Sequence, residues 1–513
     1  MAVEGYTMSP PYGGLDLVSP IDNMDPIYAL ELVNIIPGAS APELRKGYTS
    51  FASLTGANAV KTLRAMPKAN GTTDLLAVSG TKLFRIVSAG TITDVTGSTA
   101  FTSSNCSTEI FAGRMFICNG VDTVQVFNGS TNTTANSTFT GVTLADLINV
   151  SSYKKRLYFV EKNSLRFWYG GTGSVGASAL TSEDLESVFN NGGRLLFAGS
   201  YTNQTASTSQ DLFFVCSSEG EILFYSGSYP GDSAWQLVAR YYIGKPVGYN
   251  AFVRVNQDVW IITEQGIVPV SALFQTDPEQ ALTLVSARIN PLISEAAQSN
   301  PFSYRWGGAF YAIGRRVYIT VPLSETETYL LVWSIDSKGW TQFKQNAPGH
   351  AISIAIADGL PYYGSSAGVL YKAETGYNDA GNPIQFQMRG AFSFYGSRGN
   401  YKAFKDIRPL LRTQKGVAFN LGLDTDFRRR LSLETITTST GSFTPWGSTG
   451  ATVGSPGYTP WGSPWSGATE YVFDRYATKG QGHSASIRFS GAFLDAPLQI
   501  YGFEIRFDLG GQV

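Results

Sequence analysis

Catalysis near neutral pH usually depends on a titratable side chain held beside a nucleophile, and this sequence offers few such combinations. Its two histidines, His350 and His483, have no serine or cysteine nucleophile motif around them. A Ser-His or Cys-His catalytic pair is therefore not expected. The chain also lacks the phosphate-binding motif GxxxxGK[ST], the zinc motif HExxH and paired CxxC motifs. We expect no catalytic residues, no cofactor and no metal site.

The other reactive side chains are three cysteines, Cys106, Cys118 and Cys216. An odd number leaves at least one cysteine unpaired. None of them stands in a Cys-x-x-Cys motif or beside a histidine, so neither a redox pair nor a zinc site is indicated. We expect buried free thiols in a reducing compartment.

Carboxylates are the residues that a sugar-cleaving propeller would use, as a pair flanking the glycosidic bond. The segment Ser334-Ile-Asp-Ser-Lys-Gly-Trp340 is similar to the Ser-x-Asp-x-Gly-x-Thr-Trp turn of sialidases, but its glycine and tryptophan are shifted and it occurs once. We expect Asp336–Gly339 to form a hairpin turn joining Leu330–Trp333 to Trp340–Phe343. A glycan-binding or glycan-cleaving propeller is the alternative function, and it predicts an acidic, aromatic pocket on the propeller axis.

A run of three arginines, Arg428, Arg429 and Arg430, follows Asp424 and Asp426 at what reads as a strand end. We interpret it as a solvated or ion-paired edge of a subunit interface. The alternative is a contact with phosphates in a DNA conduit.

The overall charge argues against a general DNA-binding surface. Charged residues make up 15% of the chain, and 38 Lys+Arg nearly cancel 39 Asp+Glu, so the whole chain does not attract a polyanion. The first residues contain no basic and apolar signal segment, and no run of about eighteen apolar residues occurs. We expect neither Sec export nor insertion into a membrane.

The elements that would position any site are short strands. From about Leu75 to Lys372, pairs of apolar and aromatic strands separated by turns recur at spacings of roughly 40 to 55 residues, as expected for propeller blades. The fold class is therefore predicted as all-β, with a β-propeller over residues 51–376. The number of blades stays open, and two stacked β-sandwiches are the rival architecture.

Few helices are indicated. We expect three, at Leu144–Val150, Ser182–Asn190 and Asn290–Ser299, as connectors between blades, and a polar loop from Asn128 to Thr140. After about Gly376 the strands become longer and alternate polar with apolar residues, as in a sheet with one wet face. Residues 377–513 are therefore predicted to form a separate, β-sandwich-like platform domain.

A Ser/Thr/Gly-rich passage in this domain contains two nearly identical segments, Phe443-Thr-Pro-Trp-Gly-Ser448 and Tyr458-Thr-Pro-Trp-Gly-Ser463. Its tryptophans, Trp446, Trp461 and Trp465, fit two interpretations. They fill the core of their own domain, or they lie in a protruding loop that anchors a neighbouring subunit.

The N-terminal segment carries the one family resemblance. It runs through Gly13-Gly-Leu-Asp-Leu-Val-Ser-Pro-Ile-Asp-Asn-Met-Asp-Pro26, Tyr28-Ala-Leu-Glu-Leu-Val-Asn-Ile-Ile-Pro37 and Leu44-Arg-Lys-Gly-Tyr48. These residues resemble the opening of tail nozzle (tail tubular or tail hub) proteins of short-tailed phages. The match covers about a tenth of the chain. The propeller-like middle and the Trp-Gly-Ser-Pro-Trp passage agree with it.

The resemblance implies a structural virion protein without enzymatic activity. Such a protein is assembled in the host cytoplasm into a hexameric ring of the tail below the adaptor, with a central conduit for ejected double-stranded DNA and tail fibres or spikes bound outside. Residues 1–50 would form an extended arm that packs on the platform domain or a neighbouring subunit. Its candidate interface residues are Tyr28, Leu30 and Leu32. A third hypothesis is a cellular scaffold propeller that binds proteins and is not associated with a virion.

Overall fold

The computed structural model describes residues 3–129, 134–204, 209–275, 284–299, 304–324, 327–345, 350–414, 416–429, 433–437 and 469–512. The chain divides into two compact units. The propeller unit comprises Tyr48–Trp333 and Lys344–Glu374. The terminal unit comprises Met1–Gly47, Ser334–Phe343 and Thr375–Val513.

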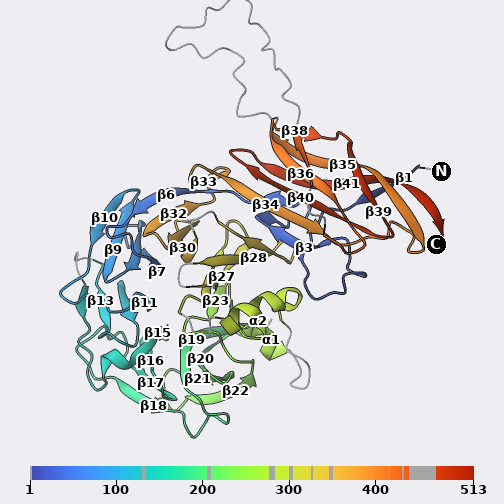
Figure 1. The fold of residues 1–513 in the computed structure, drawn as a ribbon. Coiled ribbons are helices and arrows are strands. Elements are labelled where there is room, and N and C mark those ends of the chain that lie inside the picture. The colour runs from blue at the N-terminus through green and yellow to red at the C-terminus, as the bar shows by residue number, and fades with distance from the viewer. Residues whose placement is uncertain are drawn as a thin grey trace, which may run out of the picture. The chain divides into compact units, whose positions relative to one another are not determined.

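The propeller unit is a succession of antiparallel sheets that follow one another in chain order around a common centre (Figure 1). Four of these sheets have four strands and one has three. The four-stranded sheets are β7 (Val60–Pro67), β8 (Thr73–Ser79), β9 (Lys82–Ser88) and β10 (Thr91–Asp94); β11 (Ser107–Phe111), β12 (Arg114–Cys118), β13 (Gln125–Phe127) and β14 (Thr134–Asn136); β15 (Leu147–Tyr153), β16 (Arg156–Glu161), β17 (Arg166–Tyr169) and β18 (Thr181–Asp184); and β19 (Leu195–Gln204), β20 (Ser209–Ser217), β21 (Glu221–Ser226) and β22 (Gln236–Tyr242). The three-stranded sheet is β23 (Phe252–Val255), β24 (Asp258–Thr263) and β25 (Gly266–Pro269). This arrangement confirms the predicted propeller.

Two further antiparallel groups complete the propeller unit. They are β26 (Gly307–Tyr311), β27 (Arg316–Pro322) and β28 (Thr328–Ser334), and β30 (Ala351–Ala357), β31 (Leu360–Ser365) and β32 (Val369–Ala373). The last group gains β6 (Tyr48–Ser53), which pairs antiparallel with β32. The first and last strands of the unit therefore share one sheet, which ties the two ends of the propeller together.

The blades pack on one another through large side chains. Strands β20 and β21 read as nearly continuous apolar runs because their sheet is covered on both faces. The rings of Tyr158 and Phe167 lie 4.4 and 5.4 Å from that of Phe213, which joins two successive blades. The three cysteines are free and buried, as expected from the sequence.

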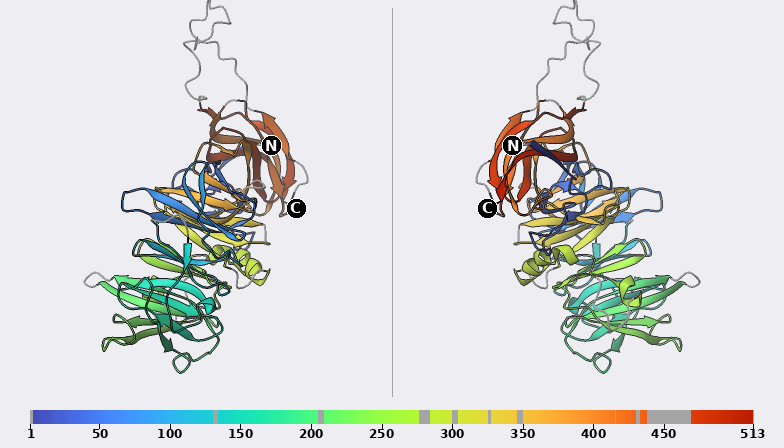
Figure 2. Two further views of the ribbon diagram at one scale, coloured as in Figure 1. Left: turned by 90° about the vertical axis from the view of Figure 1, so that its left-hand side faces the viewer. Right: turned by 90° about the vertical axis from the view of Figure 1, so that its right-hand side faces the viewer.

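The terminal unit contains two sheets. One is built on the long strands β35 (Asn400–Gln414) and β41 (Leu498–Gln512), with β1 (Val3–Met8), β4 (Ile35–Ile36), β5 (Glu43–Leu44), β38 (Thr469–Val472) and β39 (Tyr476–Gly482). The other contains β3 (Tyr28–Val33), β34 (Asn382–Gly390), β36 (Ala418–Thr425), β37 (Glu434–Thr437) and β40 (Ala485–Phe493). Ring contacts between Phe489 and Phe503 at 6.0 Å, and between Phe419 and Tyr476 at 6.3 Å, join the two sheets. Its strands from the last part of the chain are the orange and red ones in Figure 2, and those from the first residues are blue.

The N-terminal segment is part of this sandwich. Strand β1 pairs with β41, β3 pairs with β34, and the short β2 (Gly14–Leu15) runs parallel to β3. The segment Ser334–Phe343, which the sequence analysis assigned to the propeller, belongs here as well. The reason is long-range pairing: β29 (Gly339–Phe343) runs parallel to β3, and the Thr341 hydroxyl donates to the Leu32 carbonyl at 3.1 Å.

Of the three predicted helices, one is confirmed: α2 spans Asn290–Ser299. The other two predictions were wrong. Residues 144–146 form a single 3₁₀ turn before strand β15, and residues 181–184 are strand β18. In both places sheet pairing outweighs local helix propensity. The expected polar loop 128–140 contains strand β14, and helix α1 (Val270–Gln275) was not predicted.

No helix among the described residues is both long and apolar enough to cross a membrane.

Candidate functional site

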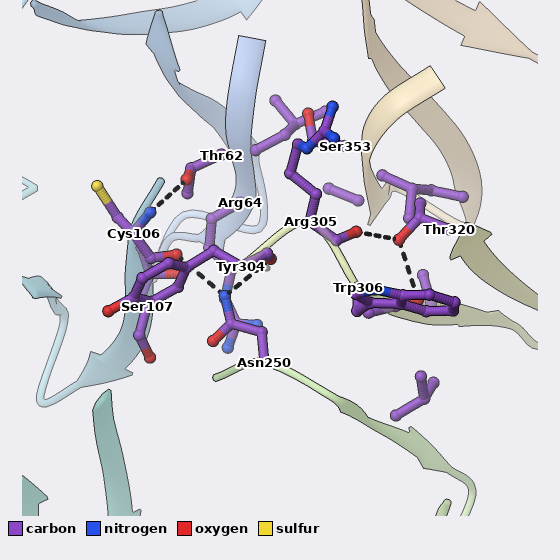
Figure 3. Close-up of a pocket in the computed structure, with 18 of the residues that line it drawn as sticks. Thr62, Arg64, Cys106, Ser107, Asn250, Tyr304, Arg305, Trp306, Thr320 and Ser353 are labelled. Atoms are coloured by element: carbon purple, nitrogen blue, oxygen red, sulfur yellow. Dashed lines mark hydrogen bonds between the residues drawn. The ribbon is translucent and has the colours of Figure 1, made fainter. Parts of the chain in front are cut away.

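A concave site lies where the innermost strands of the propeller unit meet (Figure 3). It is a cavity of about 420 Å³. Strands β7, β11, β15, β23, β26 and β30 contribute lining residues, together with Cys106, Asn250, residues 304–306 and Thr320 of β27. Because the first strand of each blade faces the axis, residues far apart in the sequence converge here.

Polar side chains fix the strands around this axial pocket. The Asn250 side-chain amide donates to the carbonyls of Cys106 and Tyr304 at 3.2 and 3.4 Å, which bridges two blades (Figure 3). The Thr62 hydroxyl accepts from the Cys106 amide at 3.0 Å, and that of Thr320 donates to the Arg305 carbonyl at 2.7 Å. These bonds satisfy backbone groups of innermost strands and adjoining segments, and they stiffen the wall of the pocket.

The pocket is strongly basic. Its charged lining residues are Lys61, Arg64, Arg254, Arg305 and Glu109. Among the described lining residues there are therefore four cations and one carboxylate, and Lys61 and Arg305 each make a further interaction of their own. Such a concentration of one sign in a protein-walled cavity strengthens the local potential.

The single carboxylate is already engaged. Glu109 lies 3.7 Å from Arg64 and accepts a hydrogen bond of 2.5 Å from the Ser152 hydroxyl. Arg254 is an exposed side chain that lines the pocket. The protein around it displaces part of its water, and this desolvation lowers the pKa of Arg254, while Glu109 acts to raise the pKa and Arg64 to lower it further.

The hydroxyl and thiol groups in the described lining are not arranged as nucleophiles. Burial raises the pKa of the Cys106 thiol well above its ordinary value. The Ser107 hydroxyl accepts from Asn149 at 3.1 Å and from the Val150 amide at 3.3 Å. No histidine is present among these lining residues. The arrangement is suited to binding negative charge rather than to activating a nucleophile.

The sugar-cleaving alternative predicted an acidic pocket, and this prediction is not met at the axis. Aromatic residues do contribute, as Phe252, Tyr304 and Trp306 line the pocket. However, Glu109 is the one carboxylate in the described lining, and glycoside hydrolysis generally needs two. The sialidase-like segment forms the expected turn between β28 and β29.

A glycine motif of the kind found in dinucleotide-binding folds follows strand β17, but it does not open a helix that could bind phosphate. Residues 171–176 have the spacing Gly-x-Gly-x-x-Gly directly after β17. In dinucleotide-binding folds this spacing opens a helix whose N-terminal amides bind phosphate. Here the segment leads instead into strand β18.

The candidate interface residues of the N-terminal segment lie on β3. Tyr28 and Leu30 are half-buried, and both remain predictions as contact residues. Leu32 is fully buried among its own neighbours, so the expectation that it contacts another subunit was wrong. Its side chain points toward the core because alternate residues of a strand face opposite sides.

Of the arginine run, Arg428 and Arg429 are exposed just after β36, and Arg429 pairs with Glu31 at 3.0 Å. The third arginine and the three candidate tryptophans lie outside the described residues: Arg430, Trp446, Trp461 and Trp465.

The terminal unit contains a buried ion pair that the sequence analysis missed. The Arg45 guanidinium donates to both carboxylate oxygens of Asp379, at 2.8 and 2.5 Å, and to the side-chain oxygen of Asn34 at 2.9 Å. Both charged side chains are almost fully buried, at 3% and 1% exposed. Arg45 belongs to the segment that carries the family resemblance, but nothing near it in the sequence indicates its partner.

No protein-family model matches the chain, and no curated protein matches it. Solved structures with a similar fold include a streptogramin B lyase, which is 11% identical, covers 64% of this chain and 98% of its own, and gives a TM-score of 0.44. The WD40 β-propeller domain of Doa1 is 12% identical over 64% of this chain and 97% of its own, with a TM-score of 0.40. YCF48 bound to a D1 peptide is 14% identical over 66% and 99%, with a TM-score of 0.39. At these identities the likeness concerns the fold alone, and the strand pairings themselves define this chain as an all-β protein with a β-propeller core.

Proposed function

We propose that this protein is a structural component of a short phage tail. In this proposal it is a subunit of an oligomeric ring, the nozzle below the adaptor. The ring forms the conduit for genome ejection and a mount for tail fibres or spikes. The expected assembly is a hexamer, located in the virion.

The observation that carries the proposal is the structural role of the residues that resemble tail nozzle proteins. Gly14 has a φ of +82°, and a Cβ there would lie 2.6 Å from the Trp340 amide nitrogen. Asn34 has a φ of 59° and donates to the Gln385 carbonyl at 2.7 Å. Arg45 makes the buried ion pair with Asp379.

These positions are specified by local geometry rather than by a general preference for polar or apolar residues. A chance resemblance in an extended arm would not be expected to include the residues with these structural roles. Their roles support the interpretation that the resemblance reflects a shared architecture of the terminal unit.

The chemistry of the axial pocket is compatible with a non-enzymatic role. Its described lining offers one carboxylate, Glu109, and no activated nucleophile. The near-neutral charge of the whole chain also suits a conduit through which a DNA duplex must slide without being held.

The decisive experiment is electron microscopy of the purified protein, alone and mixed with a candidate adaptor ring, with mass photometry at the same concentrations. We expect a six-fold annulus with a hole wide enough for duplex DNA. A chain that stays monomeric in both samples would overturn the proposal.

A charge reversal tests the arginine edge separately. We expect Arg429→Glu to weaken ring formation if this edge lies between subunits. Arg398→Glu is the matched control, because Arg398 is also an exposed arginine of the same unit with one acidic neighbour: it donates to the Asp22 carbonyl at 3.0 Å and lies 3.9 Å from the Asp22 carboxylate. A ring that is unaffected by Arg429→Glu would remove this edge from the interface without affecting the proposal of a ring.

A further inference from the structure

Three aromatic side chains of the terminal unit form an exposed strip on and beside strands β38 and β41. Tyr471, Phe473 and Tyr501 are 55%, 44% and 40% exposed. The ring of Tyr471 lies 5.5 Å from that of Phe473 and 5.9 Å from that of Tyr501. We call these three residues the aromatic strip. Single exposed apolar residues are normal on a protein surface, but several gathered in one place mark a binding surface.

Strand pairing places two polar side chains beside the strip. Arg412 of β35 lies directly opposite Tyr471 of β38 on one side and Gln499 of β41 on the other. The Arg412 guanidinium lies 6.0 Å from the centre of the Tyr471 ring, and the Tyr501 hydroxyl donates to the Gln499 side-chain oxygen at 3.1 Å. Directly paired residues face the same side of a sheet, so one row across three strands joins the aromatic strip to Arg412 and Gln499.

Arg412 and Gln499 also line a pocket of about 210 Å³ in the same unit. The rest of its described lining is Glu43, Leu44, Tyr377, Pro497 and Leu498. The volume lies below the range of about 300–1,000 Å³ typical of drug-sized ligands, so it suits a single small ring. The described lining contains one cation, Arg412, and one carboxylate, Glu43, which makes a further interaction of its own. These charges do not select a highly charged ligand.

Planar polar side chains beside exposed aromatic rings match the chemistry of a sugar. Guanidinium and amide groups each present two polar atoms side by side, so Arg412 and Gln499 can each bridge two neighbouring hydroxyls. The C–H faces of a sugar ring are apolar and pack on aromatic faces such as those of the strip. An apolar side chain of a protein partner would instead leave the polar groups of the pocket without hydrogen-bond partners, which costs free energy.

We infer that the terminal unit binds a neutral oligosaccharide, with one sugar ring in the pocket beside Arg412 and Gln499 and the adjoining rings along the aromatic strip. None of the three residues of the strip belongs to the described lining of the pocket, so the strip extends the binding surface beyond it. A chain of several sugar rings therefore makes more contact than a single sugar. The site binds its ligand and carries out no reaction on it.

This inference goes beyond the proposed function and does not depend on it. The site lies within the terminal unit of one chain, so it holds for a single chain and for a ring. It also differs from the sugar-cleaving alternative, which placed the sugar on the propeller axis. A failure to form rings would leave the inference standing, and a failure to bind sugars would leave the ring proposal standing.

Isothermal titration calorimetry of the full chain tests the inference. The neutral probes are maltohexaose, cellohexaose, chitohexaose and mannohexaose, and the acidic probe is hexaguluronate. We expect a neutral hexasaccharide to bind once per chain and more tightly than its monosaccharide. Its affinity should change little between about 0.05 M and about 0.3 M salt, because a neutral ligand is not screened. Tighter binding of hexaguluronate than of every neutral probe would overturn the assignment to neutral sugars.

Substitutions at exposed positions separate the strip from the rest of the surface. Tyr471→Ala removes the central ring and should weaken binding by about tenfold, whereas Tyr471→Phe keeps the ring and should change the affinity by less than about twofold. Arg412→Ala should also weaken binding by about tenfold, and it tests the inference if Tyr471→Ala does not fold. Tyr12→Ala is the matched control, since Tyr12 is an exposed tyrosine of the same unit outside the strip and the described pocket lining.

The inference is overturned if no neutral probe binds, or if Tyr471→Ala and Arg412→Ala bind as tightly as the unchanged protein. It is also overturned if Tyr12→Ala weakens binding as much as Tyr471→Ala, because the contact would then be non-specific. If no sugar binds and Tyr471→Ala abolishes the ring seen by electron microscopy, the strip is a contact between proteins. The inference then fails while the ring proposal stands.

Discussion

The substitution Asp379→Asn should destabilise the terminal unit more than any surface change of the same charge. The replacement is nearly isosteric, so packing is kept, but it leaves the Arg45 guanidinium buried without a counter-charge. The carboxylate is 1% exposed and makes two hydrogen bonds to Arg45, at 2.8 and 2.5 Å. Removing one partner of such a buried pair typically costs about 3–5 kcal/mol.

That cost translates into a measurable change in melting. For a unit of this size, about 1 kcal/mol corresponds to a shift of roughly 2–4 °C, so the melting temperature of the terminal unit should fall by about 10 °C. Differential scanning calorimetry gives the shift of the transition. Hydrogen–deuterium exchange of peptides covering β3 and β34 identifies the transition as that of the terminal unit.

The double substitution Arg45→Met with Asp379→Leu should recover much of the loss, because it removes both charges. The control is Arg398→Gln, which removes an exposed guanidinium that donates to the Asp22 carbonyl at 3.0 Å, lies 3.9 Å from the Asp22 carboxylate and covers the Phe394 ring, and it should change stability by less than about 1 kcal/mol. The reasoning would be refuted if Asp379→Asn and Arg398→Gln shifted the melting temperature equally, or if the double variant were less stable than the single one.

Three further outcomes are expected. Gly14→Ala should lower the stability of the terminal unit by more than about 1 kcal/mol, because the new Cβ would sit on a residue with positive φ and would clash with the Trp340 backbone. Gly396→Ala is the control: Gly396 also has a positive φ, of 84°, but nothing lies within 4 Å of its Cβ, so this substitution should cost less. Equal losses of stability for the two variants in urea unfolding would refute the role of the clash. Burial by itself raises the pKa of Asp406, but hydrogen bonds from its arginine partners outweigh that effect and hold the pKa below its ordinary value. This stabilisation is present above the unfolded-state pKa of about 3.9 and is lost as pH falls through the folded-state pKa. The melting temperature of the unchanged protein should therefore exceed that of Asp406→Asn near about pH 5, and the difference should shrink towards about pH 2. A difference in melting temperature that stays constant over this range would contradict the prediction. The three buried thiols should react with Ellman's reagent only after unfolding, since burial raises the pKa of each one, and rapid labelling of the native protein would contradict the structure.

The sequence by itself was sufficient to predict the fold class. Short apolar strands separated by turns, such as Leu75–Gly80 and Leu83–Val87, are local patterns, and they do form β8 and β9. The same holds for α2, whose Pro291 lies in its first turn. The absence of helices at 144–150 and 182–190 was not predictable in this way, because strand pairing with β16 and β17 decides those segments.

Only the tertiary structure decided which distant residues meet. Arg45 and Asp379 are 334 positions apart, and neither has a sequence context that indicates the other. The segment Ser334–Phe343 joined the terminal unit for the same reason, since its partner β3 lies at the other end of the chain.

The axial pocket illustrates the limit most clearly. Lys61 and Arg64 lie on β7, Glu109 lies on β11, Arg254 lies on β23 and Arg305 precedes β26, and each is an ordinary polar residue in its own segment. They come together when the propeller brings its innermost strands around one axis. Composition gives the balance of charges over the whole chain, but where those charges gather depends on contacts that only the folded chain makes.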